Sequence, residues 1–107
     1  MKEQEDTPQI IFDNIDQIKA LCVAHQVKSL FVFGSVCTSR FDEESDIDFL
    51  VSFHPMGFGD YADTYFALAD KLELLFHRPV DLITDKSLSN PYFIASVNKT
   101  KTQLYGS

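Results

Sequence analysis

The sequence predicts an α/β domain in which a small mixed sheet of three to four strands is flanked by helices. Two long segments repeat apolar residues at the three- and four-residue spacing of a helix, and short runs rich in β-branched and aromatic residues follow each of them. The length of 107 residues suits one domain and leaves no room for a second. We therefore expect residues 1–107 to fold as one unit, with the almost wholly polar residues 1–6 disordered.

The first predicted helix begins at Thr7-Pro8, where a capping residue precedes a proline, or at Asp13. Its apolar face consists of residues three and four positions apart, namely Ile11, Ile15, Ile18, Cys22 and His25. We expect this helix to end near Gln26. Cys22 and His25 could form part of a metal site, but packing in the core is the better interpretation of a pair on an apolar helix face.

Two strands are predicted next. Leu30–Phe33 is apolar on both faces, as in a central strand of a covered sheet, and Gly34 ends it. The second strand is Asp46–Phe53. Its residues alternate between the two faces, with Ile47, Phe49 and Val51 on one and Asp46, Asp48 and Leu50 on the other. Two carboxylates therefore share one face of the sheet.

A loop rich in proline and glycine follows, and Asp60 is suited to cap a second helix that Pro79 stops. The apolar stripe of this helix consists of Tyr61, Tyr65, Leu68, Leu72 and Leu75. Val80–Thr84 predicts a third strand, and a short helix is expected over Tyr92–Asn98. Residues Thr100–Tyr105 are either a fourth, edge strand or a tail.

Charge and composition exclude several classes of partner. Nine Lys+Arg against sixteen Asp+Glu give a net charge of −7, so the average surface repels phosphate backbones and we expect no stable nucleic-acid binding. No apolar run approaches the roughly 20 residues needed to cross a bilayer. Two cysteines, Cys22 and Cys37, are too few for a disulfide framework. These features predict a soluble, cytoplasmic protein.

One segment carries residues suited to chemistry. Gly34 and Ser35 follow a strand, ten residues intervene, and Asp46 and Asp48 then open the next strand. Asp81 stands on the strand after that. Gly34 lets the backbone approach a ligand closely, and the amides after Ser35 would open a helix whose N-terminus attracts phosphate.

The three acids predict a metal site. Asp46 and Asp48 aim at one point, and Asp81 joins them if the third strand lies beside the second. Converging carboxylates repel one another unless a cation lies between them. Hard oxygen ligands that leave room for water and substrate phosphates suit Mg²⁺. The chemistry implied is phosphoryl or nucleotidyl transfer with two ions roughly 4 Å apart.

These residues resemble the minimal nucleotidyltransferases of the DNA polymerase β-like superfamily. The hallmark of that family is G-S, about ten residues, D-x-D at the head of a strand and a lone acid on the following strand, and this chain matches it at every part. The resemblance implies the nucleotidyltransferase (polymerase β palm-like) fold and an ATP-using enzyme. It further implies that Asp46 and Asp48 bind both Mg²⁺ ions, that Asp81 holds the catalytic ion and activates the acceptor hydroxyl, and that Gly34-Ser35 grips the triphosphate.

Stand-alone bacterial members of this size resemble the antitoxin of a pair with a HEPN-domain ribonuclease toxin. The resemblance therefore implies transfer of AMP to a tyrosine of such a toxin, which silences it. The chain departs from the family in one place, because many members follow G-S with x-A-R-G and here Arg40 comes two places late. Arg40 is the candidate to replace that arginine at the nucleotide.

Two other functions stay open. One is a binding module that neutralises its partner by contact, and the other is nucleotidyl transfer to a small molecule such as an aminoglycoside. The helix from Asp60 and the C-terminal segment are the expected partner surfaces, because Phe58, Tyr92 and Phe93 leave apolar groups near loops. The sequence leaves the acceptor, the nucleotide preference, the oligomeric state and the basic residues that hold the triphosphate open.

Overall fold

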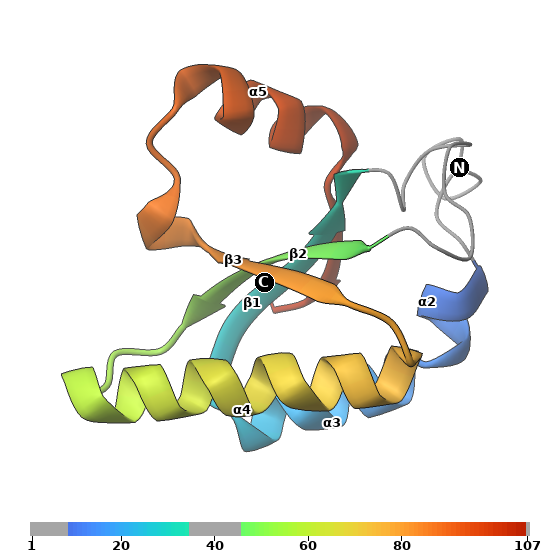
Figure 1. Cartoon of the computed structure of the whole chain (residues 1–107), viewed down its shortest axis with the longest axis vertical. Helices are drawn as coiled ribbons and strands as arrows, with labels where there is room; N and C mark the ends of the chain where they lie inside the picture. The colour runs from blue at the N-terminus through green and yellow to red at the C-terminus, as the bar shows by residue number, and fades with distance from the viewer. Residues whose placement is uncertain (1–8, 35–45, 107) are drawn as a thin grey trace.

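The computed structural model describes residues 9–34 and 46–106. The expectations for Thr7-Pro8 and for residues 1–6, and those for Ser35, Cys37 and Arg40, lie outside the described residues. A four-stranded sheet forms the centre of the molecule, with helices α3 and α4 on one face and α5 on the other (Figure 1). Within the described ranges, no helix is both long and apolar enough to cross a membrane.

The sheet has the strand order β3-β2-β1-β4. Its strands are β1 (Val27–Phe33), β2 (Ile47–Phe53), β3 (Val80–Thr84) and β4 (Thr102–Tyr105). Strand β1 pairs antiparallel with both β2 and β4, whereas β2 and β3 are parallel. The expected mixed sheet is confirmed, and of the two alternatives for the C-terminal segment the structure shows the edge strand.

The first helical segment is broken into α2 (Gln9–Asp13) and α3 (Ile15–Ala24), where the sequence pattern predicted one continuous helix. The break is at Asn14, whose φ of −111° and ψ of 15° are not helical. Its side-chain Nδ2 donates a hydrogen bond of 2.8 Å to the carbonyl oxygen of Ile10. Asparagine commonly replaces helical backbone bonds with such local bonds, which explains the interruption.

Helix α4 (Phe58–Phe76) connects the parallel strands β2 and β3. It begins two residues before the predicted cap Asp60, because Gly57 takes the extended N-cap conformation. Asp60 instead lies in the first turn, where the helix dipole favours a carboxylate. The helix ends at His77, whose φ is 57° and whose amide donates to the carbonyl of Glu73.

A short 3₁₀ turn, η2 (Asp85–Ser87), follows β3, and helix α5 (Pro91–Thr100) packs on the opposite face of the sheet. Helix α5 is longer at both ends than the sequence predicted. Its start is fixed by the Asn90 side chain, which accepts hydrogen bonds from two backbone amides of the first turn, and by a proline at the first helical position.

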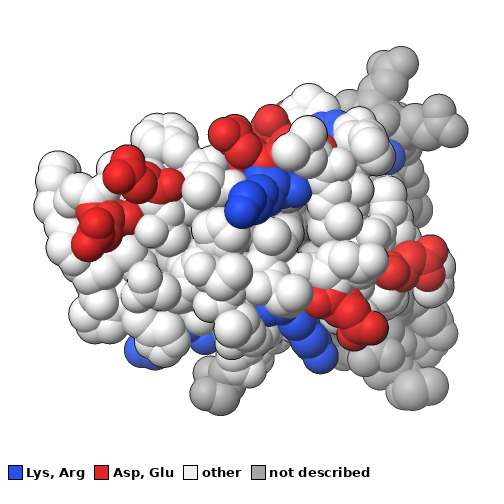
Figure 2. Space-filling view, turned by 90° about the horizontal axis from the view of Figure 1, so that it is seen from below, with Lys and Arg blue, Asp and Glu red and all other residues white. Residues whose placement is uncertain are grey.

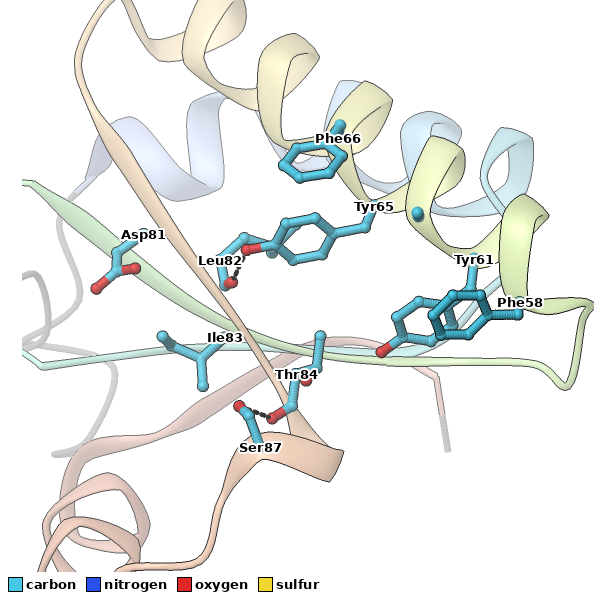
Figure 3. Close-up of a pocket in the computed structure, with 10 residues that line it drawn as sticks. Phe58, Tyr61, Tyr65, Phe66, Asp81, Leu82, Ile83, Thr84 and Ser87 are labelled. Carbon is cyan, nitrogen blue, oxygen red and sulfur yellow. Dashed lines mark hydrogen bonds between the residues drawn. The ribbon is translucent and has the colours of Figure 1, made fainter.

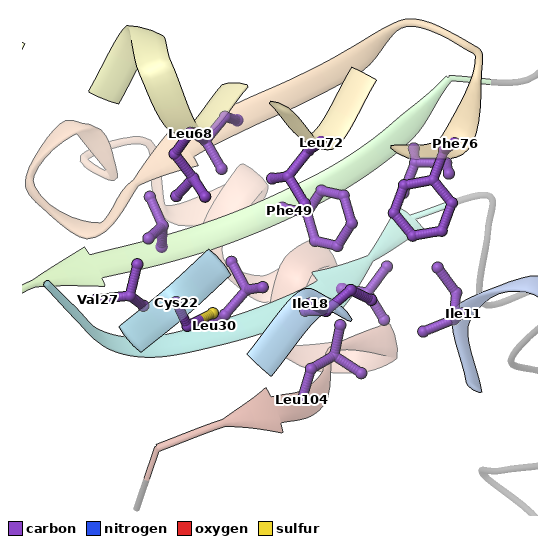
Figure 4. Close-up of a cluster of buried hydrophobic side chains, with 14 residues drawn as sticks. Ile11, Ile18, Cys22, Val27, Leu30, Phe49, Leu68, Leu72, Phe76 and Leu104 are labelled. Carbon is purple, nitrogen blue, oxygen red and sulfur yellow. The ribbon is translucent and has the colours of Figure 1, made fainter. Parts of the chain in front are cut away.

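The main hydrophobic core lies between the sheet and helices α3 and α4 (Figure 4). Ile47, Phe49 and Val51 are fully buried there, as the alternation of β2 predicted. A smaller cluster of Phe33, Leu50 and Val97 lies on the other face, beneath α5. Cys22 and His25 are buried, as expected, and the His25 ring Nδ1 is 2.8 Å from the Leu21 carbonyl oxygen. Among the described residues, the buried hydrophobic side chains are Ile11, Ile18, Cys22, Val27, Leu30, Val32, Phe33, Ile47, Phe49, Leu50, Val51, Leu68, Leu72, Phe76, Leu82, Val97 and Leu104.

Candidate functional site

The acids that the sequence singled out meet at one end of the sheet. Asp48 and Asp81 are direct register partners on the parallel strands β2 and β3, and Asp46 immediately precedes β2. On the other side of β2, Asp48 is paired with Phe33, the last residue of β1. Gly34 therefore follows β1 at the same end of the sheet as the acids. The strand order brings together residues from three segments of the sequence.

Asp48 is the acid that its surroundings perturb most. Partial burial, with smaller contributions from the neighbouring carboxylates of Asp81 and Asp46, raises the pKa of Asp48 from its ordinary 3.8 to about 6. Apolar residues flank all three acids in the sequence, which favours burial, yet Asp46 and Asp81 are exposed because both lie at the end of the sheet. Asp48 alone is half-buried.

Gly34 fits closely against Asp48. Its φ is 81°, and a Cβ atom at this position would lie 2.5 Å from Oδ2 of Asp48. Glycine is therefore required both by the backbone conformation and by the space. The Gly34 amide donates a hydrogen bond of 3.0 Å to the hydroxyl oxygen of Thr100, 66 positions further along the chain.

Thr100 is a site residue that the sequence analysis missed. It lies at the end of α5, and nothing in the local pattern links that helix to the glycine turn. Its contact places the C-terminal end of α5 beside Gly34. Lys99 and Lys101 adjoin Thr100 in the chain, whereas Lys71 lines a groove between α3 and α4. The structure thus separates basic residues that the sequence could not rank.

The donor chemistry of the acids fits Mg²⁺. The carboxylates of Asp46 and Asp81 act electrostatically on Asp48, and the missing side chain at Gly34 leaves the place that the Asp48 carboxylate occupies. Across the described ranges, however, no three metal-binding side chains converge closely enough to hold an ion by themselves. Mg²⁺ is usually held by one or two carboxylates and completes its shell with water and substrate phosphates, so an incomplete protein cage is compatible with it.

An aromatic groove of about 440 Å³ begins beside Asp81 and runs between α4 and β3 (Figure 3). The residues that line it are Phe58, Tyr61, Ala62, Tyr65, Phe66, Asp81, Leu82, Ile83, Thr84 and Ser87. The Tyr65 hydroxyl donates a hydrogen bond of 2.6 Å to the Leu82 carbonyl oxygen. Burial raises the pKa of Tyr65, and the nearby charges of Asp81 and Tyr61 raise it further.

The sequence placed Tyr61 and Tyr65 in the core, and both are indeed half-buried. Tyr65 packs against the main core, and the Tyr61 ring packs edge-on against Phe53 at 5.3 Å between centroids. The same two rings nevertheless form a wall of the groove. The apolar periodicity of α4 cannot predict this groove, because the groove depends on the distance between α4 and β3.

The sequence pattern of the family "Polymerase beta, Nucleotidyltransferase" matches residues 16–107. With the glycine turn and the acids at the end of the sheet, this match makes the chain a member of that family, and the protein is a nucleotidyltransferase. The fold class and the family resemblance expected from the sequence are both confirmed.

Three known proteins illustrate what this chain is similar to. A protein of Methanocaldococcus jannaschii named as a protein adenylyltransferase is 38% identical over 81 residues, which are 76% of this chain and 80% of the relative. A solved minimal nucleotidyltransferase is 27% identical, with a TM-score of 0.64 over 88% of this chain and 92% of its own. The MNT antitoxin complex with the tri-AMPylated HEPN toxin of Shewanella oneidensis shares the fold, at 22% identity and a TM-score of 0.62, over 90% of this chain and 72% of that one.

Proposed function

We propose that this protein transfers AMP from ATP to a tyrosine hydroxyl of a protein partner, and that the partner is a HEPN-domain toxin which the transfer silences. The observation that carries the proposal is the pairing of Asp48 with Asp81 beside Gly34. It is supported by the relative named as a protein adenylyltransferase and by the fold shared with an antitoxin in complex with an AMPylated toxin.

The proposal assigns a role to each acid. Asp46 and Asp48 would hold two Mg²⁺ ions, with Asp81 as a further ligand of the catalytic one. When bound, Mg²⁺ supplies neutralisation of the charge on the triphosphate and polarisation of the attacking hydroxyl. Gly34 would receive the triphosphate close to its backbone. The roles of Ser35 and Arg40 at the nucleotide remain predictions from the sequence.

The proposed reaction is one displacement at the α-phosphorus of ATP. The tyrosine oxygen forms a bond to this phosphorus, the bond to the bridging oxygen breaks, and pyrophosphate leaves. The hydroxyl proton passes to a carboxylate oxygen of Asp81, which is exposed and therefore within reach of an incoming acceptor. The strand order puts the glycine turn and Asp81 on opposite sides of β2, so the nucleotide and the acceptor approach from different directions.

The test is incubation of the protein with ATP, Mg²⁺ and a HEPN-domain toxin, followed by intact mass measurement of the toxin. We expect an increase by one or more AMP units, and no increase with Asp48→Asn or without Mg²⁺. Asp70→Asn, an exposed carboxylate further along α4 and outside the aromatic groove, is the matched control and should retain transfer. An unmodified toxin, or transfer that survives Asp48→Asn, contradicts the proposal.

A second candidate function is neutralisation of a partner by contact alone. It is favoured by the exposed aromatic side chains, since Phe58 is 93% and Tyr92 87% exposed. This function predicts that Asp48→Asn still suppresses the toxin while AMP transfer is abolished. Measuring toxin activity alongside toxin mass separates the two functions.

A further inference from the structure

The aromatic groove continues beyond the end of β3. A second hollow of about 430 Å³ shares Phe58, Tyr61, Thr84 and Ser87 with the first and extends to Met56 and Lys86. The combined groove therefore has an acid, Asp81, at one end and a base, Lys86, at the other. The Lys86 Nζ atom lies 5.4 Å from the centroid of the Tyr61 ring.

The groove lies along the edge of the sheet that β3 forms. Among the described residues, β3 is the outermost strand on this side, so within them one row of its backbone groups has no neighbouring strand. The Tyr65 hydroxyl already satisfies the Leu82 carbonyl at this strand. An occupant would therefore contact the rings more than it would extend the sheet.

The walls of the groove expose aromatic surface to solvent. Phe66 is 64% exposed and Phe58 is 93% exposed, and both line the groove drawn in Figure 3. Adjacent exposed aromatic side chains on one helix face are typical of a surface that a protein partner covers.

The position of the groove relative to the acids selects its occupant. Gly34 adjoins Asp48 on the β1 side, whereas the groove opens from Asp81 on the β3 side. In the proposed function the nucleotide lies at the glycine turn. The groove is consequently left for the acceptor, whose hydroxyl has to reach Asp81.

We infer that this groove docks an extended segment of the acceptor protein, with its tyrosine at Asp81, apolar neighbours across the rings of Phe58 and Phe66, and a carboxylate at Lys86. The inference rests on the proposed function for the identity of the acceptor residue. The charge at Lys86 adds a selectivity that the three acids alone do not give, because it favours segments with an acidic residue a few positions from the tyrosine.

The test uses heptapeptides that carry a central tyrosine between valines and a glutamate at one end, with lysine-for-glutamate versions for comparison. Binding is followed by changes in the amide spectrum of the ¹⁵N-labelled protein. We expect changes in α4 residues 58–66 and in β3, with tighter binding of the glutamate peptides. One exposed ion pair corresponds to a preference of about two- to fivefold.

A charge reversal makes the test specific. Lys86→Glu should reverse the preference in favour of the lysine peptides, whereas Lys71→Glu, on α4 in the groove that it forms with α3, should keep the original preference. Phe66→Ala should weaken peptide binding about fivefold or more. Leu74→Ala removes an exposed apolar side chain outside the groove and should change nothing. The variants' own amide spectra establish that they are folded.

Three results would overturn the inference. The first is the absence of groove signals at millimolar peptide, and the second is peptide binding between α3 and α4 instead. The third is that a nonhydrolysable ATP analogue changes the amide signals of the groove residues and binds Phe66→Ala more weakly than the wild type. The groove would then hold the base of the nucleotide. If peptides bind as expected but the toxin gains no AMP, the proposed function fails while the docking site stands.

Discussion

Replacing Asp48 by asparagine should stabilise the metal-free protein at neutral pH. The rise in the pKa of Asp48 from 3.8 to about 6 means that folding penalises its ionised form. A rise of this size corresponds to about 3 kcal/mol if it is fully expressed. Because the carboxyl is only half-buried and water screens part of the repulsion, we expect Asp48→Asn to raise the free energy of unfolding by about 1–2 kcal/mol.

The effect should depend on pH with a definite sign. Well below pH 3.8, both the folded and the unfolded protein keep Asp48 protonated, and its raised pKa has no effect on stability. As pH rises from 3.8 to about 6, the unfolded chain releases a proton that the folded protein still holds, so wild-type stability falls, and above about pH 6 the loss is complete. The advantage of Asp48→Asn should therefore be small near pH 4, grow up to about pH 6 and be complete at pH 7.

Urea unfolding at pH 4, 5, 6 and 7 in the presence of a chelator measures this difference, with Asp70→Asn as the exposed control on α4. Addition of Mg²⁺ should reduce the difference in unfolding free energy between Asp48→Asn and the wild type, since the ion stabilises the protein that retains the Asp48 carboxylate. A variant that is less stable than the wild type at pH 7, or a difference that does not change with pH, would refute the electrostatic reasoning.

Three further substitutions test the fold around the site. Gly34→Ala should lower the free energy of unfolding by about 1–3 kcal/mol, because alanine is strained at a φ of 81° and its Cβ would overlap Asp48. Urea unfolding measures this loss, and an unchanged stability would contradict the close approach of Gly34 to Asp48. Leu72→Ala should lower the free energy of unfolding by about 2–5 kcal/mol, since Leu72 is fully buried in the main core. Urea unfolding measures this loss as well. Asn90→Ala removes the cap of α5 and should cost about 1 kcal/mol, with hydrogen exchange accelerating in that helix before it does so in α4.

The sequence predicted β2, β3 and the order of elements well because β2 and α4 carry strong periodic patterns, whereas β1 begins at Val27, three residues before the predicted start at Leu30. The alternation of Ile47, Phe49 and Val51 fixes which face of β2 enters the core, and this also fixes where Asp48 points. Strand β3 was predicted with its observed bounds. Helix boundaries were less accurate, because Asn14 and Gly57 act through backbone conformation that apolar periodicity does not record.

The candidate site was only partly accessible from the sequence. The spacing of Gly34, Asp48 and Asp81 sufficed to bring them together once the third strand lay beside the second. The exposure of Asp81 and the hydrogen bond to Thr100 depend on distances between elements that are far apart in the chain. The aromatic groove depends on the same kind of distance, between α4 and the edge of β3.

The central strand β1 has a neighbour that is synthesised late. Val32 pairs with Thr102, about 70 residues downstream, which a ribosome takes roughly 4–15 s to add. Throughout that interval one side of β1 lacks its partner, and the Gly34 amide lacks the hydroxyl it will bond. Nascent chains are thus exposed to edge-to-edge association until translation passes β4, and chaperones that shield strand edges should have their largest effect on the yield of this protein during that window.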